Sequence, residues 1–343
     1  MMDLLTLIII CTKVVVVFAF TILALILMMY SERRVSAFIQ IRLGPNRVGP
    51  KGLLQPIADG IKFFMKEEII PTGVDKPIFI LAPVMFLIPA LMTFAVIPFG
   101  APLHLFGREI TLQVADINIG ILYILALTSL GVYAIVLAGW SSNSKYPLLG
   151  GLRSSAQLLS YEIALGLAIV SIILLSSSLR LNDIVSDQQG HLFSWNVFKQ
   201  PLAFVIFLIA TYAETNRLPF DLTEAEQELV GGYHTEYSSM KFAMFFMAEY
   251  TNMVTASALI VTLFFGGWDI PWVDESALGN LGGIVSVFAF ALKTAFFLFL
   301  YIWVRWTFPR FRYDQLMSLG WKVLLPLAIL NIIITAGYLT LVA

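Results

Sequence analysis

The chain has 343 residues, of which 59% are apolar and only 13% are charged. A soluble domain has about 45 to 50% apolar and about 25% charged residues, so this composition excludes a soluble globular protein. The 21 Lys and Arg residues nearly balance the 22 Asp and Glu residues, and the net charge of -1 gives no electrostatic basis for a nucleic-acid partner.

Eight segments are apolar over a length close to the roughly 20 residues that a helix needs to cross a bilayer. They cover residues 4–30, 78–99, 117–140, 155–178, 197–213, 242–268, 281–304 and 323–342. The fifth is short, because Pro201 lies near its start and the polar residues from Glu214 end it. The sequence therefore predicts an all-α fold and a single integral membrane domain over residues 1–343.

The basic residues predict how the segments are oriented. Sixteen of the 21 Lys and Arg residues lie in the loops that follow the first, third, fifth and seventh segments. Because basic loops stay on the cytoplasmic or matrix side of a membrane, these loops are predicted to lie there. Both termini are then expected on the opposite side, which is the periplasmic side in a bacterium.

The predicted loop 31–77 is basic, with eight Lys and Arg residues against five acidic ones. Three glycines and two prolines within 44–52 exclude regular structure there. Apolar residues then recur at helical spacing from Leu54 to Met65, which predicts an amphipathic helix in the membrane interface. The basic residues have two possible roles. They either anchor the loop on the cytoplasmic side, or form a docking platform or the polar wall of a site. Counting charges does not distinguish these roles.

The predicted loop 214–241 is acidic, with six Asp and Glu residues against Arg217 and Lys241. It also carries large apolar and aromatic residues, among them Phe220, Tyr233 and Tyr237, which a merely solvated loop does not need. This pattern favours a folded and partly buried acidic cluster.

Three glutamates fall in one half of the predicted membrane. Glu162 and Glu249 lie about eight residues inside the cytoplasmic end of their segments, roughly 12 Å deep, and Glu214 closes the same end of the fifth segment. An ionisable group in a span usually faces protein or water and marks an ion or proton path, although a hydrogen-bonded packing group is the alternative. Lys293, in the seventh segment, is interpreted as a counter-ion within the bundle or a participant in that path.

Redox cofactors and metals are not expected on this chain. Cys11 is the single cysteine and the three histidines lie outside the predicted spans, which excludes disulfides, iron-sulfur ligation and paired membrane haems. The chain also has no phosphate-binding loop, metal-binding His and carboxylate spacing, or nucleophile motif. Electrons, if the protein acts in electron transfer, must be carried by another chain.

Several sequence blocks resemble the family of the H-type membrane subunit of NADH-quinone oxidoreductase, respiratory complex I. They are ERRVSAFIQIRLGPNRVGP at 32–50, ADGIK at 58–62, AETNRLPFDL at 213–222, EAEQEL at 224–229, GYHTEY at 232–237 and PRFRYDQLM at 309–317. The resemblance implies a membrane component of a proton-translocating enzyme, which forms much of the quinone chamber beside the peripheral arm. Quinone is then the substrate, and flavin and iron-sulfur clusters belong to partner subunits.

The resemblance also implies residue roles. Chamber residues would be Glu32, Arg33, Arg42, Asp59, Glu224, Glu226 and Glu228. The path that links the chamber to the proton-pumping arm would contain Glu162, Glu214, Glu249 and Lys293, and peripheral-arm docking would use Arg47, Lys51, Arg310 and Arg312. The expected partners are the peripheral-arm subunits, the small membrane subunits, quinone and the lipid bilayer, in a bacterial plasma membrane or alternatively an organelle inner membrane.

Two other functions remain as alternatives. A quinone-free component of membrane-bound hydrogenases shares part of the loop pattern, but the block at 213–221 and the complete acidic motif favour the respiratory form. A stand-alone ion transporter would use the intramembrane Glu and Lys residues as substrate sites. Its inverted repeats are not apparent in the sequence, and the large cytoplasmic loops argue against it.

Overall fold

The computed structural model describes residues 4–105, 108–221, 230–273 and 279–342, and this part of the chain is mostly helical. The long helices are α1 (Leu4–Ile39), α3 (Lys76–Met92), α4 (Gly120–Ser141), α5 (Lys145–Ser176), α10 (Ser239–Phe264), α11 (Asn280–Thr307) and α13 (Leu325–Val342). The shorter helices are α2 (Gln55–Met65), α6 (Leu181–Ser186), α7 (Asn196–Lys199), α8 (Pro201–Glu214) and α12 (Tyr313–Ser318). A π-helical segment, Leu319–Leu324, joins α12 to α13.

Seven helices in the described residues are long and apolar enough to span a membrane, and they confirm an all-α membrane fold. The fifth predicted segment, which the sequence already marks as short, corresponds to α8, and α8 has only 14 residues. At about 1.5 Å per residue it extends roughly 21 Å, less than a bilayer core of about 30 Å. Pro201 occupies the first position of α8, where the missing N–H costs nothing, and it separates α8 from α7.

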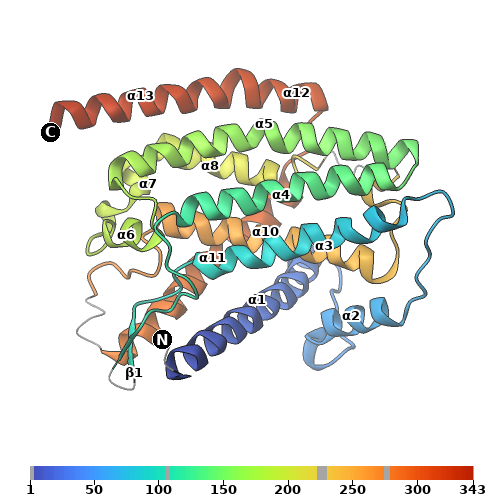
Figure 1. Cartoon of the computed structure of the whole chain (residues 1–343), viewed down its shortest axis with the longest axis horizontal. Helices are drawn as coiled ribbons and strands as arrows, with labels where there is room; N and C mark the ends of the chain where they lie inside the picture. Colours follow the sequence, from blue (N-terminus) through green and yellow to red (C-terminus); the bar gives the residue numbers. More distant parts are fainter. Residues whose placement is uncertain (1–3, 106–107, 222–229, 274–278, 343) are drawn as a thin grey trace.

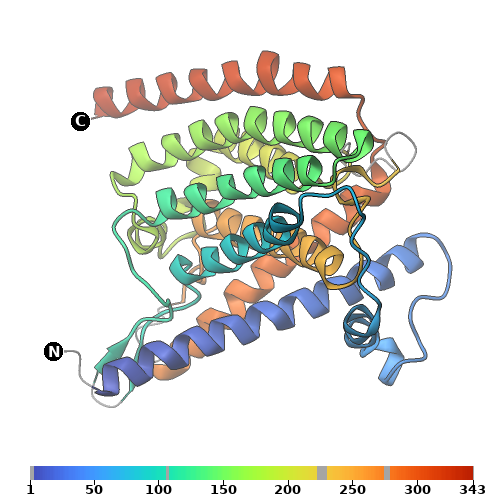
Figure 2. The same cartoon turned by 45° about the vertical axis from the view of Figure 1, so that its right-hand side comes forward.

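The spanning helices form one bundle, in which α5 lies between α13 and α4 (Figures 1 and 2). Helix α5 packs against α4, α8 and α13, and α3 packs against α4 and α10. Helix α10 is the most buried span, whereas α1 crosses at an angle to the bundle and leaves most of its apolar surface exposed. This exposed surface suits contact with lipid or with neighbouring subunits.

The two ends of the bundle differ. One end, here called the α2 end, holds α2 and the turn between α4 and α5 (Figure 1). The other, the hairpin end, holds two short antiparallel strands, β1 (Leu103–Leu105) and β2 (Arg108–Ile110), which the sequence did not predict. Helix α1 begins and α13 ends at the hairpin end (Figures 1 and 2).

The predicted interfacial helix corresponds to α2. Its apolar residues Ile57, Ile61, Phe64 and Met65 are exposed, as expected for a face that enters the membrane interface. The hydroxyl of Ser239, at the start of α10, lies 2.9 Å from the carbonyl oxygens at the C-terminal end of α2, those of Phe63 and Lys66. These contacts attach α2 to the bundle.

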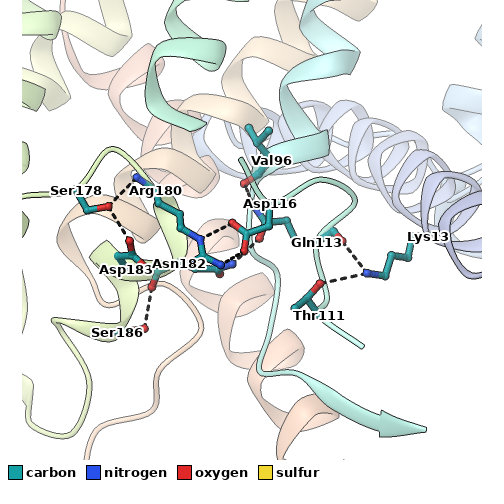
Figure 3. Close-up of polar contacts among 10 residues, drawn as sticks. All are labelled: Lys13, Val96, Thr111, Gln113, Asp116, Ser178, Arg180, Asn182, Asp183 and Ser186. Atoms are coloured by element: carbon teal, nitrogen blue, oxygen red, sulfur yellow. Dashed lines mark hydrogen bonds and ion pairs between the residues drawn. The ribbon is translucent and has the colours of Figure 1, made fainter. Parts of the chain in front are cut away.

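The segments 99–116 and 179–200, which carry no recognisable motif, meet in a polar network at the hairpin end (Figure 3). The Arg180 guanidinium donates to both carboxylate oxygens of Asp116, with 2.9 Å between Nε and Oδ1. It also reaches the Asp183 carboxylate at 3.4 Å. The guanidinium holds the pKa of Asp116 below its usual value, and the same contact raises the pKa of Arg180.

A second part of this network connects α1 to the bundle. Lys13 Nζ donates to the carbonyl oxygen of Gln113 at 3.1 Å and to the Thr111 hydroxyl at 3.2 Å. The buried Gln113 side chain in turn accepts a bond from Asn182 Nδ2 at 2.7 Å and donates to Val96 O at 2.5 Å (Figure 3). Lys13 therefore gives the outer half of α1, which packs little on the bundle, a polar attachment.

We expect Asp116→Asn to lower the thermal stability of the assembly at neutral pH, by no more than about 1 kcal/mol because Arg180 is partly exposed. The pKa of Asp116 is lowered on folding, so its stabilisation is present above the ordinary value of 3.8 and is lost as pH falls below it. The measurement is the midpoint of heat inactivation of wild type and variant across pH. Asp187→Asn, at an exposed neighbour, is the control, and equal differences at neutral and at strongly acidic pH would contradict the prediction.

Candidate functional site

The structure brings Glu162 and Glu214 together, although they come from different helices. Glu162 lies on α5 and Glu214 is the last residue of α8, and both line one narrow cavity with Thr128 of α4 and Asn252 of α10. A second cavity is also lined by Glu214, and it shares Thr128 and Asn252 with the first. The space suits water rather than a quinone ring.

Adjacent hydroxyl residues of α4 contact these two glutamates. The Thr128 hydroxyl lies within hydrogen-bond reach of the Glu214 carboxyl, and the Ser129 hydroxyl is hydrogen-bonded to Glu162 Oε1. Ser129 Oγ also lies 2.8 Å from the carbonyl oxygen of Leu125. Because a hydroxyl has one proton, Ser129 can donate to ionised Glu162, or donate to Leu125 O while it accepts a hydrogen bond from neutral Glu162. The contact therefore suits both protonation states of Glu162.

Local sequence determines where Glu214 stands. Helix α8 ends because Asn216 adopts a left-handed conformation, which asparagine tolerates at a helix end. The freed carbonyl oxygen of Ala213 accepts a bond of 2.8 Å from the side-chain amide of Gln157, a fully buried residue of α5. The same amide lies 3.0 Å from the Phe220 carbonyl oxygen, so Gln157 holds both ends of the turn after Glu214.

Glu249 lies one helical turn before Asn252 on α10 but outside both cavity linings. Its carboxylate oxygen accepts a hydrogen bond of 2.8 Å from the hydroxyl of Tyr233, a fully buried residue of the acidic loop. Residues three apart on a helix share a face, so Glu249 and Asn252 lie on one side of α10. The third predicted glutamate thus shares a face of α10 with Asn252, which lines the cavity of the other two.

Glu32 of α1 is the centre of a buried ion cluster at the α2 end. Its carboxylate accepts from Arg217 Nη1 at 3.2 Å, from the Arg305 guanidinium and from the Tyr250 hydroxyl. Arg217 also lies over the Tyr250 ring, 4.5 Å from the centroid. Only 7% of Glu32 is exposed, so this one carboxylate joins α1, α10, α11 and the turn after α8 through charge-assisted bonds.

The next residue, Arg33, points to α2 instead. Its guanidinium pairs with the Asp59 carboxylate, which also accepts from Gln55 Nε2 at 3.2 Å. The Tyr30 hydroxyl donates to Lys51 O at 2.9 Å, one turn before Arg33 on α1. Helix α2 is therefore fastened to α1 on one side and to the start of α10 on the other.

The remaining predicted residues are distributed differently. Arg42, predicted for the chamber, is exposed. Arg47 and Lys51 are exposed, as a docking surface requires, and Arg312 is exposed beside Asp314. Arg310 contacts Asp221 of the acidic loop at 3.2 Å, so part of its charge is directed into the protein. Glu224, Glu226 and Glu228 lie outside the described residues.

Lys293 contacts the backbone just after α10. Its Nζ donates to the carbonyl oxygens of Phe265, Gly267 and Asp269 at 2.7 to 3.1 Å, just beyond the C-terminal end of α10. It also lies 4.4 Å from the centre of the Trp195 ring. A cation at a helix C-terminus is favourable, and this contact places Lys293 toward the hairpin end.

Sequence reasoning missed Thr128, Ser129, Asn252, Tyr250 and Arg305. The first three are polar residues inside apolar segments, a signal that is informative because such groups need a partner in the membrane. The structure adds no metal site to this set: the described residues contain no group of three His, Cys, Asp or Glu side chains able to hold a metal ion.

Comparison with known proteins identifies the family of this chain. The family model described as NADH dehydrogenase matches residues 12–336. The chain is 51% identical to an H-type subunit of NADH-quinone oxidoreductase from Cytophaga hutchinsonii, over 96% of this chain and 97% of that protein. It is 56% identical to an H-type subunit from Geobacter metallireducens over 94% and 93%, and 51% identical to the one from Flavobacterium psychrophilum over 94% of each. The chain therefore belongs to the NADH dehydrogenase family, together with these H-type subunits of NADH-quinone oxidoreductase.

Proposed function

We propose that this chain is the H-type membrane subunit of a proton-translocating NADH-quinone oxidoreductase, and that it couples quinone reduction to proton movement. The long match to proteins of that name supports this assignment over the two alternatives, a hydrogenase component and a stand-alone transporter. Partner subunits supply the flavin, the iron-sulfur clusters and the remaining walls of the quinone chamber. The bacterial relatives favour a bacterial plasma membrane.

The chamber is proposed at the α2 end, where α1, α2 and the acidic loop meet. The observation that carries this proposal is the pair of successive residues Glu32 and Arg33, one directed into the bundle and the other to Asp59 of α2. Arg42 and the residues Glu224, Glu226 and Glu228 complete the proposed chamber set. Arg47, Lys51, Arg310 and Arg312 are proposed to face the peripheral arm.

The coupling path is proposed to run through Glu214, Glu162 and Glu249. Reduction of quinone changes the charge near the Glu32 cluster, whose Arg217 lies three residues after Glu214. A change in that charge shifts the balance between the protonated and ionised forms of nearby carboxyl groups. The contacts of Glu214 with Thr128 and of Glu162 with Ser129 support a role in which these groups exchange protons.

Asp59→Asn tests the chamber part of this proposal. Loss of the charge weakens the attachment of α2 to Arg33, and we expect the KM for a short-chain quinone to rise roughly fivefold, the factor that about 1 kcal/mol gives, with a smaller change in kcat. The measurement is quinone reductase activity of the assembled complex, with assembly checked on a native gel. Glu67→Gln, at an exposed position after α2, is the matched control. An unchanged KM in an assembled Asp59→Asn complex would contradict the proposed chamber wall.

A further inference from the structure

Asn252 is a polar side chain in the most buried span of the chain, and its position is unusual. It lines both cavities that Glu214 lines, and it lies one turn beyond Glu249 on the same face of α10. Its side-chain oxygen Oδ1 is shielded from solvent and makes no hydrogen bond to any residue in the part of the chain that the structure describes. A buried amide oxygen without a partner costs about 1 to 3 kcal/mol, so this atom requires one.

The neighbours of Asn252 indicate the chemistry of that partner. One cavity adds Glu162, and the other adds the hydroxyl residues Thr211, Thr215 and Thr255. Thr255 Oγ1 is bonded to Thr93 Oγ1 at 3.1 Å and to Thr251 O at 3.1 Å, so its bonding capacity is directed elsewhere. A water molecule fits such a site, because it can accept from or donate to a carboxyl group while it donates to an amide oxygen.

We propose that Asn252 is a positioning residue that holds water between Glu214 and Glu162, on the side of α10 that carries Glu249. The proposal rests on the coupling path proposed above, and it adds the residue that makes the path continuous. One carboxyl group releases a proton to the oxygen of the held water as that water passes one of its own protons to the other carboxylate. Two O–H bonds break, one on the donor carboxyl group and one on the water, and two form, one on the water and one on the receiving carboxylate, so no electron is transferred.

Asn252 itself does not carry the proton, because an amide neither gains nor loses a proton near neutral pH. Its role is to hold the water that does. Asn252 fixes the water by donating to or accepting from it, and the adjacent hydroxyl of Thr128 limits the space in which the water can move. An apolar side chain of similar size would remove the polar partner and displace the water.

The first test compares Asn252→Leu with Asn252→Ser in the assembled complex. Asn252→Leu should lower coupled proton pumping about tenfold, which is the loss expected when one buried hydrogen bond of about 1.4 kcal/mol is removed. It should also raise the solvent isotope effect in D2O, because proton transfer becomes rate-limiting. Asn252→Ser, which leaves room for water and keeps a hydroxyl, should restore most of the pumping and the wild-type isotope effect. Thr251→Val is the control, because the Thr251 hydroxyl is bonded to Met247 O within its own helix and lines neither cavity.

The outcomes separate this inference from the proposed path. If Glu214→Gln abolishes pumping while assembled Asn252→Leu pumps with the rate and isotope effect of wild type, the path stands and the role of Asn252 is overturned. If both variants pump normally, the path itself fails. A density map of the wild-type complex provides a test without substitution: ordered water within hydrogen-bond distance of Asn252 Oδ1 supports the proposal, and a bond from this oxygen to a partner subunit overturns it.

Discussion

Glu32→Gln is expected to destabilise the assembly more than any other single conservative substitution considered for this chain. The Glu32 carboxylate accepts bonds from Arg217, Arg305 and Tyr250 while only 7% of the residue is exposed. Removing its charge leaves two guanidinium groups at the junction of α1, α10 and α11 without their carboxylate. Removing one partner of a buried ion pair lowers the free energy of unfolding by about 3 to 5 kcal/mol. We expect a lower temperature of heat inactivation and a large loss of quinone reductase activity.

The control for Glu32→Gln is Glu67→Gln, which removes an exposed carboxylate near the same end of the bundle. A double variant sharpens the test. Arg305→Gln added to Glu32→Gln removes one of the two guanidinium groups that bind this carboxylate, so the double variant should lose less stability than the sum of the single losses. Additive losses, or a Glu32→Gln complex as heat-stable as wild type, would show that the cluster does not hold these helices together.

Glu214→Gln is expected to have the largest effect on function. Glutamine keeps the shape of the side chain between the two cavities, but it cannot take up or release a proton in the physiological range. If Glu214 passes protons, we expect pumping by the assembled complex to fall at least about tenfold, in the lower part of the range that general acid and base groups contribute. The measurement is proton translocation per electron in vesicles, with assembly checked on a native gel.

Glu109→Gln provides the same chemical change at an exposed position on strand β2, and it should leave pumping unchanged. Glu162→Gln should resemble Glu214→Gln, because the two side chains line one cavity. Normal proton translocation in an assembled Glu214→Gln complex would exclude Glu214 from the path, whatever the result for Glu162.

The bundle shows which features were predictable and why. The spans from Leu4, Lys76, Gly120 and Asn280 begin within about three residues of the predicted boundaries, because a bilayer requires a long apolar helix wherever the chain crosses it. Helix α2 follows from its apolar spacing. The hairpin of β1 and β2 was not predictable, since its strands have three residues each and no alternation long enough to detect.

The candidate site divides in the same way. The glutamates were identifiable from the sequence, because placing a carboxyl group in a membrane span costs free energy and usually marks a function. This argument does not depend on which residues surround the carboxyl group. Their partners were not identifiable: Ser129 meets Glu162 and Tyr233 meets Glu249 only because α4, α5, α10 and the acidic loop pack side by side. Lys293 illustrates the same limit, because its position in a span did not reveal that it donates to the carbonyl oxygens after α10.

The sequence by itself determined that this chain is an all-α membrane protein, which family it resembles and which charged residues lie within its spans. These properties depend on local composition and on the energetic cost of placing a polar group in lipid. Only the tertiary structure decided that Glu32 holds four elements together, that Glu162 and Glu214 share a cavity and that Asn252 lines two cavities with Glu214. Those contacts join residues far apart in the chain, and they depend on how the helices pack rather than on the preference of any one segment.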